Sequence, residues 1–417
     1  MKSRLNGAYF AYSISQGVNL LAPLLIVPHL IKVLGLELIG VILLCQTIII
    51  YLTVIVDYHF NLITVKELSL NRDKPSVINS IFIDALYTRI VLFTACVIIF
   101  LITIYSYPLL KAHLMIAILS FPILLGQVLI NNWFFQGMED LIRLSLLNIL
   151  SKACYIISVY FFVNSSSDAI WPNFLLGIVN IAAGIFAIIY LSKKFTIQYS
   201  FPAFTKIVVQ LKEGFTILLS NTAIIIYANS AIFILGFFVL PSILGEYGVT
   251  DKIISIGRAF LSIYFTVSFP RLSRLFAINK KAFLNFYKRY FLVFTVFIFI
   301  FCMSVFFMSE FIINYFTQGN STSSLVKLLR TSSIIPIITC LNIPAYQTLI
   351  LSNQKKIYTS VLISASVFSL VMLFFLVPKY QAFGAVYAII ITEIYVTITL
   401  WLFAIKKLKL IEDEAFV

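Results

Sequence analysis

Two arginines lie deep inside stretches of sequence that are otherwise apolar. Arg89 and Arg258 each follow about ten residues of such a stretch, which at 1.5 Å per helical residue is a depth of about 15 Å. A guanidinium there costs at least about 2.5 kcal/mol, so it normally faces a watery cavity or a charged partner. Its planar donors suit phosphate oxygens. We therefore predict an anion-accessible cavity, with a salt bridge to Asp84 or Glu393 as the alternative.

Three acidic residues also fall within or at the end of apolar stretches, and none of them faces lipid cheaply. They are Asp57, Asp84 and Glu393. A carboxyl group in a medium of low dielectric favours its neutral form and can exchange protons. For Glu393 two interpretations stay open, namely a contact that fastens helices together and a proton or cation site.

The composition requires a membrane protein to hold these residues. Hydrophobic residues make up 61% of the chain, charged residues only 11%, and the mean hydropathy is +1.04, whereas soluble proteins have about 25% charged residues. The amino-terminal segment runs from two cations into a full-length span without a small-residue cleavage site, so we expect it to remain as an anchor. The five cysteines stand singly, which indicates neither disulfides nor a zinc site.

The secondary structure that positions these residues is predicted to be all-α. A helix needs roughly 20 apolar residues to cross about 30 Å of hydrocarbon. On this basis we predict twelve transmembrane helices, at residues 8–31, 39–62, 79–104, 113–134, 144–163, 169–192, 214–239, 251–270, 287–309, 329–351, 357–377 and 382–404. Several of them contain proline, which removes a backbone hydrogen bond and favours a kink.

The basic residues predict the orientation of these helices. With both termini in the cytoplasm, 22 of the 30 Lys and Arg residues fall on the cytoplasmic side and 6 on the other, as the positive-inside rule requires. The net charge of +14 is then explained by insertion and by contact with anionic membrane lipids. Nucleic-acid binding is disfavoured, because no soluble basic domain is predicted.

The longest polar connection divides the spans six and six. We predict an amino-terminal bundle at 1–195, a cytoplasmic connection at 196–213 and a carboxy-terminal bundle at 214–417. Leu-Gly recurs at Leu34-Gly35 and Leu244-Gly245, which is consistent with an internal repeat. An even number of helices in each half makes the halves parallel repeats, an organisation in which transporters bind substrate between the halves.

Three motifs resemble those of O-antigen flippases, in the polysaccharide-exporter branch of the multidrug/oligosaccharidyl-lipid/polysaccharide superfamily. The first is VDYHFNLITVKELSLNRDK, with matches at Asp57, Phe60, Asn61, Asn71, Arg72 and Asp73. The second is NWFFQGMEDL, with matches at Trp133, Phe135, Gln136, Gly137 and Glu139. The third covers the seventh and eighth spans, with matches at Gly214, Ser220, Tyr227, Gly236, Gly245, Tyr247, Asp251, Lys252, Pro270 and Arg271. His59 stands where the family usually has Gly, which has a wider choice of backbone angles.

This resemblance implies a flippase that moves undecaprenyl-pyrophosphate-linked oligosaccharide from the cytoplasmic to the periplasmic leaflet of the bacterial inner membrane by alternating access. The resemblance implies that the protein uses no cofactor. It also implies two protein partners, the polymerase and the chain-length regulator of the same pathway. We assign substrate binding to Arg89, Arg258, Lys252, Arg271, Trp133 and Tyr227, and proton or Na⁺ coupling to Glu393, Asp57 or Asp84. The chain has no G-x-x-x-x-G-K-[ST] motif, which disfavours direct use of ATP.

Two alternatives stay open. A drug or cation antiporter of the same superfamily shares the twelve-helix plan but favours acidic over basic residues in its cavity. A membrane polysaccharide polymerase or ligase needs a large periplasmic loop with catalytic residues. The predicted non-cytoplasmic loops are short and carry isolated acids, at Asp168, Glu246 and Glu310, so the sequence predicts a transporter rather than an enzyme.

Overall fold

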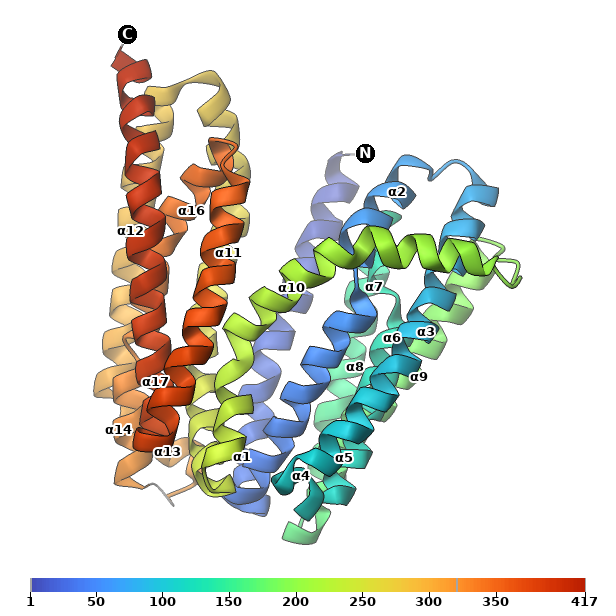
Figure 1. Cartoon of the computed structure of the whole chain (residues 1–417), viewed down its shortest axis with the longest axis vertical. Helices are drawn as coiled ribbons and strands as arrows, with labels where there is room; N and C mark the ends of the chain where they lie inside the picture. Colours follow the sequence, from blue (N-terminus) through green and yellow to red (C-terminus); the bar gives the residue numbers. More distant parts are fainter. Residues whose placement is uncertain (1, 320–321, 417) are drawn as a thin grey trace. The chain divides into compact units, whose positions relative to one another are not determined.

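The computed structural model describes residues 2–319 and 322–416, and these residues form helices joined by short turns. Figure 1 shows their order along the chain. The helices of the first half are α1 (Lys2–Asp57), the π-helix η1 (Phe60–Thr64), α2 (Val65–Leu70), α3 (Pro75–Ser106), α4 (Pro108–Ala112), α5 (Leu114–Ser120), α6 (Pro122–Ile130), α7 (Asn132–Gly137), α8 (Leu141–Phe162), η2 (Ser166–Ile170) and α9 (Trp171–Lys194). Those of the second half are α10 (Phe204–Phe238), α11 (Pro241–Ile278), α12 (Lys280–Phe307), α13 (Ser309–Thr317), α14 (Ser323–Ser332), α15 (Ile335–Cys340), α16 (Asn342–Leu351) and α17 (Lys355–Phe416).

The all-helical, multi-span fold is confirmed. Within the described residues, ten helical stretches are long and apolar enough to cross a membrane. Two of them, Ile14–Asp57 and Lys355–Leu408, are each long enough to cross twice. Each breaks at one non-helical residue, Gly35 with φ 78° and Gln381 with φ 53°. The ten stretches therefore correspond to the twelve predicted crossings.

Two spans are broken into shorter helices. The span Leu114–Gly137 consists of α5, α6 and α7, and Pro122 is the first residue of α6. Asn131, with φ 51°, separates α6 from α7. The span Ser323–Leu351 is divided in the same way into α14, α15 and α16. Each break leaves backbone carbonyls without helical partners, and other groups must satisfy them inside a membrane.

Two helices end at residues other than those that end the predicted spans. The helix predicted to continue to residue 62 ends at Asp57, because Tyr58 adopts a left-handed conformation with φ 41° and the chain continues as the π-helix η1. His59, where the family usually has Gly, has an ordinary φ of −107°. The helix predicted to end at residue 270 continues through Pro270 to Ile278. There Asn279 ends α11 and caps α12, since its side chain accepts a hydrogen bond from the Ala282 N–H.

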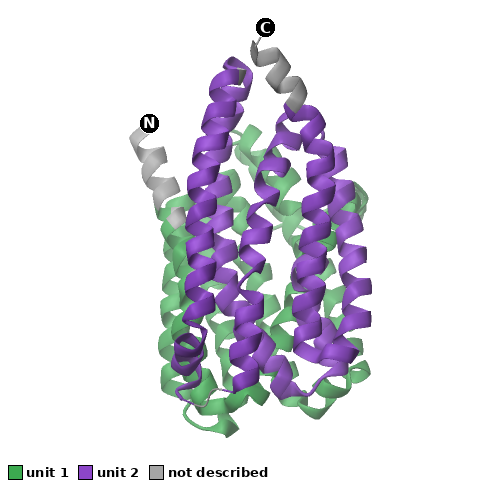
Figure 2. Ribbon diagram, turned by 90° about the vertical axis from the view of Figure 1, so that its left-hand side faces the viewer, with its two compact units in different colours: residues 1–225 green, residues 226–417 purple. Residues whose placement is uncertain are grey.

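The chain forms two compact units, residues 1–225 and 226–417 (Figure 2). Their boundary lies inside α10, whereas the sequence analysis placed the division in the connection 196–213. The predicted domain bounds stay a prediction. α10 begins at Phe204, and its first half is part of unit 1. The Tyr58 hydroxyl donates to the Leu211 carbonyl, and Gly214 lies against the rings of Tyr58 and His59. The parallel-repeat relation of the two halves stays a prediction.

Close packing of α6 against α9 organises unit 1. A Cβ added at Gly177 of α9 would lie 2.7 Å from the backbone nitrogen of Ile123. Gly126 of α6 lies as tightly against Asn180, and Gly184 against Leu129. Small residues let helix backbones approach closely in membrane proteins. The three glycines therefore fix the position of α6, which carries the groups around Arg89.

Candidate functional site

Arg89 caps the broken fourth span. Its Nη1 donates to the Val128 carbonyl and to Asn131 Oδ1, both at 2.9 Å, and its Nη2 donates to the Gln127 carbonyl at 2.9 Å. Asn131 Nδ2 in turn donates to the Leu129 carbonyl at 2.8 Å. Gln127, Val128 and Leu129 belong to the last turn of α6, whose carbonyls have no helical partner. A cation there also interacts favourably with the helix dipole.

The charge of Arg89 is neutralised by the end of α1. Its Nη2 lies 3.0 Å from Oδ1 of Asp57. The Arg89 side chain is 2% exposed and that of Asp57 is 35% exposed. Arg89 thus joins α3, α6 and α1 in one buried contact, and its Nε has no partner among the described residues.

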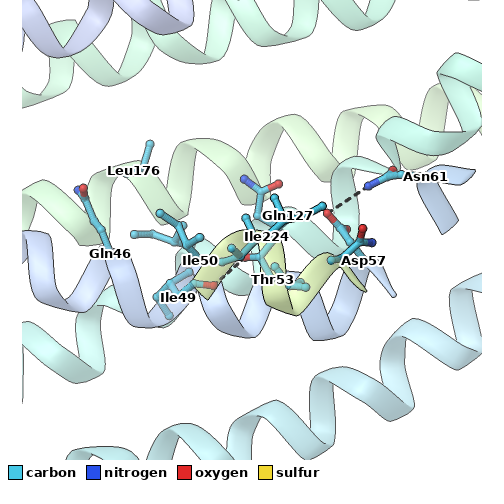
Figure 3. A pocket seen from close by; sticks show the side chains of 13 residues that line it. Gln46, Ile49, Ile50, Thr53, Asp57, Asn61, Gln127, Leu176 and Ile224 are labelled. Carbon is cyan, nitrogen blue, oxygen red and sulfur yellow. Dashed lines mark hydrogen bonds between the residues drawn. The ribbon is translucent and has the colours of Figure 1, made fainter. Parts of the chain in front are cut away.

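Asp57 lies at one end of a cavity of about 450 Å³ in unit 1. Figure 3 shows Asp57 and Asn61 at one end of this cavity and Gln46 at the other. Asn61 Nδ2 contacts Asp57 Oδ2 at 3.4 Å. The wall between the polar ends is mostly apolar and comprises Ile49, Ile50, Thr53, Val54, Ile123, Gln127, Leu176, Asn221, Ile224 and Ile225. The cavity has the size of a ligand pocket, for which about 300–1,000 Å³ is usual.

Arg89 does not line this cavity, because its side chain is buried behind Asp57, which does. The alternative partner proposed from the sequence, Asp84, is engaged elsewhere. Its Oδ2 accepts from Lys206 Nζ and from Ser80 Oγ, both at 3.1 Å. This contact fastens the start of α10 to α3.

In unit 2, Arg258 pairs with Asp251 on the same helix, α11. The two residues are seven apart, or about two turns, and therefore share a helix face. Their side chains are 31% and 24% exposed. Both line a narrow pocket with Tyr247 and Ser332. Arg258 thus keeps an accessible part, whereas Arg89 does not.

Glu393 lies in a network of hydrogen bonds between α10, α16 and α17. The Tyr227 hydroxyl donates to Oε1 of Glu393, and Asn342 Nδ2 donates to its Oε2 at 2.9 Å. Thr397 Oγ1 donates to Asn342 Oδ1 at 2.5 Å. Glu393 is 7% exposed. The structure therefore brings together Tyr227 and Glu393, which the sequence analysis assigned to different tasks.

The other residues assigned from the sequence occupy different surroundings. Trp133 is 1% exposed and packs among Phe60, Phe82 and Phe134. Lys252 is partly exposed on α11. Arg271 is exposed on the same helix, with its guanidinium carbon 4.6 Å from the ring centroid of Phe286. Trp133 is thus a core residue, and the two cations remain accessible.

The sequence analysis missed the amides that complete these contacts. Asn131 accepts from Arg89, and Asn342 donates to Glu393. Each lies inside an apolar span, where an amide needs a partner. The sequence analysis considered only charged residues inside apolar spans. The same search extended to Asn and Gln would have found Asn131 and Asn342. The pairing of Asp251 with Arg258 could also have been predicted, because a spacing of seven residues places both on one helix face.

A cluster of charges at the end of α7 fixes the adjoining helices. Asp140 Oδ2 accepts from Lys194 Nζ at 2.6 Å and from the Tyr190 hydroxyl at 2.9 Å, and Arg143 Nη1 donates to Asp140 Oδ1 at 2.8 Å. Burial alone raises the pKa of Asp140. Hydrogen bonds from Lys194, Arg143 and Tyr190 outweigh it, so the pKa of Asp140 is lower than the ordinary 3.8. These bonds join α8 to α9.

We expect Asp140→Asn to lower the free energy of unfolding by about 1.5–3 kcal/mol at neutral pH, the usual contribution of hydrogen bonds to a charged group. Because the folded pKa is depressed, the contribution is complete above the unfolded value of 3.8 and is lost as the pH falls through the lower folded value. Thermal unfolding of the detergent-solubilised protein against pH measures this. The wild type should approach the variant in strong acid, and an equal difference at every pH would contradict the assignment.

Comparison with known proteins agrees with the fold and motifs. Residues 8–276 match the family model described as polysaccharide biosynthesis protein. The protein named “Putative O-antigen transporter” of Escherichia coli strain K12 is 26% identical over 408 residues, with 98% of each chain covered. A multidrug resistance MATE family transporter of the MOP superfamily, in an inward-facing conformation, superposes with TM-score 0.74 at 13% identity over 97% of this chain and 95% of its own.

A lipid II flippase, MurJ, in an inward closed conformation, superposes with TM-score 0.73 at 15% identity, with 98% of this chain and 90% of its own covered. At these identities the two solved structures establish the fold alone, which is all-helical and crosses the membrane many times. The family model covers more than half of the chain. The chain therefore belongs to the polysaccharide biosynthesis protein family.

Proposed function

We propose that this protein translocates a lipid-linked oligosaccharide, the O-antigen repeat unit on undecaprenyl pyrophosphate, from the cytoplasmic to the periplasmic leaflet. The observation that carries the proposal is similarity over 98% of both chains to a relative named for O-antigen transport. A membrane transporter is favoured over an enzyme, because the relative that matches over 98% of both chains is named a transporter.

Under this proposal, the cationic residues that the sequence analysis assigned to the substrate have two different roles. Arg258, Lys252 and Arg271 of α11 keep exposed surface and are the proposed contacts for the anionic head group. Guanidinium groups bind phosphate oxygens through two parallel hydrogen bonds. Arg89 instead positions Asp57 at the cavity in unit 1. Trp133 supports the same region from the core, and Tyr227 holds Glu393.

Alternating access is the proposed mechanism, with both termini in the cytoplasm as the distribution of basic residues favours. The sugar part would cross in the aqueous passage while the lipid tail stays in the bilayer. The polymerase and the chain-length regulator that use the exported repeat unit are the proposed protein partners. They would act on the product at the periplasmic face.

Complementation tests the proposal. The gene is expressed in a strain that lacks its own O-antigen flippase but makes a matching repeat unit, and surface polysaccharide is measured. We expect restored polymer. Absence of polymer, despite correct insertion and a matched repeat unit, would contradict the proposal, and efflux of cationic dyes by the reconstituted protein would favour the antiporter alternative.

We further propose Glu393 as the site of ion coupling. Its two oxygens accept from Tyr227 and Asn342 inside unit 2, so a change of protonation would rearrange α10, α16 and α17 together. We expect Glu393→Gln to reduce gradient-driven transport at least about tenfold, within the usual range of coupling free energies. Transport in vesicles with and without an imposed pH gradient measures this effect.

Glu310→Gln is the matched control, because Glu310 is exposed on α13. It should leave transport and its dependence on the gradient unchanged. If Glu393→Gln retains the full dependence on the gradient, Glu393 only fastens helices, and Asp57 and Asp84 remain the candidates from the sequence analysis.

A further inference from the structure

A second cavity of unit 1, which we name the amide pocket, has an unusual lining. It measures about 200 Å³ and is enclosed by α1, α6, α7, α8 and α9. Seven of its eleven lining residues carry a carboxamide, and two more are Ser151 and Lys152. Such a concentration of polar groups within membrane-spanning helices is expensive unless the groups have partners. The cavity therefore calls for a polar occupant.

The described wall of the amide pocket decides the charge of that occupant. It contains no carboxylate, and its single charged side chain is Lys152. Hard cations such as Ca²⁺ and Mg²⁺ prefer carboxylate oxygens, and a lysine repels them. The wall is thus suited to a neutral or acidic molecule.

The carboxamides indicate the chemical class of the molecule that the amide pocket binds. Each carboxamide offers two donors and one acceptor oxygen, and each sugar hydroxyl is at once a donor and an acceptor. Oδ1 of Asn132 is buried without a hydrogen-bond partner among the described residues, and a hydroxyl donor would satisfy it. At about 200 Å³ the pocket is smaller than the usual 300–1,000 Å³ for drug-sized ligands. It has room for one sugar ring, not for a whole repeat unit.

The packing of unit 1 places this pocket next to the larger cavity. Gly126 lets Asn180 of α9 approach α6 closely, beside Gln127. Gln127 is the one residue of the described chain that lines both cavities. Its carbonyl accepts from Arg89, the partner of Asp57. Gln127 thus borders both the amide pocket and the cavity that holds Asp57.

We propose that the amide pocket binds a single sugar ring, with Lys152 favouring rings that carry a carboxylate, and that it selects among oligosaccharide substrates. Its biological meaning rests on the proposed function. Sugar binding itself does not, because a free glycoside would occupy the same pocket. The site is distinct from the cations of α11, which are assigned to the head group.

Saturation-transfer NMR of the full-length protein in lipid nanodiscs tests the proposal. The probes are methyl α-glucopyranoside and its acidic counterpart, methyl α-glucopyranosiduronate. We expect both to bind. Asn148→Leu should weaken both at least about tenfold, because it removes the hydrogen bonds of the carboxamide to the bound ring. Lys152→Met should weaken only the acidic probe. Asn164→Ala, in the exposed connection after α8, is the control and should bind like the wild type.

Asn148→Asp keeps the size of the side chain and decides the matter if Asn148→Leu does not fold, as judged by size exclusion. It should retain the neutral glycoside and weaken the acidic one. Absence of saturation transfer in the wild type, or unchanged binding in both Asn148 variants, would overturn the proposal. Complementation distinguishes the sugar-binding proposal from the transport proposal. Restored polymer without glycoside binding refutes only the sugar-binding proposal. Glycoside binding without restored polymer refutes only the transport proposal.

Discussion

Arg89→Ala should destabilise the protein by about 3–5 kcal/mol, the usual cost of removing one partner from a buried ion pair. The substitution leaves Asp57 without its cation and the carbonyls of Gln127 and Val128 without donors at the end of α6. It also leaves a cavity where the guanidinium was. Thermal unfolding monitored by size exclusion in detergent measures the loss, and surface polysaccharide should fall with the amount of folded protein.

Two further variants identify the cause. Arg89→Lys keeps the charge but lacks the planar fork that reaches both α6 and Asp57, so it should restore only a small part of the stability. Asp57→Asn should cost less than Arg89→Ala, because the bonds from Arg89 to α6 remain. If Arg89→Ala leaves the unfolding temperature unchanged and abolishes transport, Arg89 acts on the substrate directly, and our assignment of it as a helix cap is wrong.

Gly177→Ala should have the second large effect. The added Cβ would meet the backbone of Pro122 and Ile123, 2.7 Å from the Ile123 nitrogen, and backbone atoms cannot rotate away. The two helices must separate, which costs about 1–3 kcal/mol for overpacking and moves α6 relative to Arg89. We expect a lower unfolding temperature and reduced transport from the folded fraction.

Gly17→Ala provides the matched control. Gly17 also lies inside a helix, but a Cβ there would meet nothing within 4 Å. Alanine is favoured over glycine within helices by about 1 kcal/mol, so this variant should be as stable as the wild type or more stable. Equal losses from Gly17→Ala and Gly177→Ala would show that close packing of α6 on α9 is not the cause.

The membrane spans were predictable because the bilayer sets their length. All twelve predicted spans correspond to helical stretches of the described chain that are long and apolar enough to cross a membrane, since about 20 apolar residues are needed for each. The breaks within the spans were harder to predict from the sequence. Pro122 indicates a boundary through its own chemistry. Asn131 adopts a left-handed conformation and accepts a hydrogen bond from Arg89, which is distant in sequence. Local patterns do not contain that contact.

The charged groups of the site were predicted and their partners were not. Burial cost alone selects Arg89, Arg258 and Glu393 from the sequence. Arg89 pairs with Asp57 at the end of α1, whereas Asp84, on the same helix as Arg89, pairs with Lys206 of α10. The pair in α11 needed no tertiary knowledge, because Asp251 and Arg258 lie on one face of one helix. Roles in transport remain proposals for every one of these residues.

The chain passes from one compact unit to the other within α10, a continuous helix of 35 residues. A flexible linker would let each unit turn without affecting its neighbour. In α10 the backbone is helical on both sides of residues 225 and 226, so the chain continues from one unit into the next as a helix rather than as a loop. Tyr227, the donor to Glu393, lies one residue beyond this point. The point where the chain passes from one unit to the next is therefore close in sequence to the residue that holds the proposed coupling carboxylate.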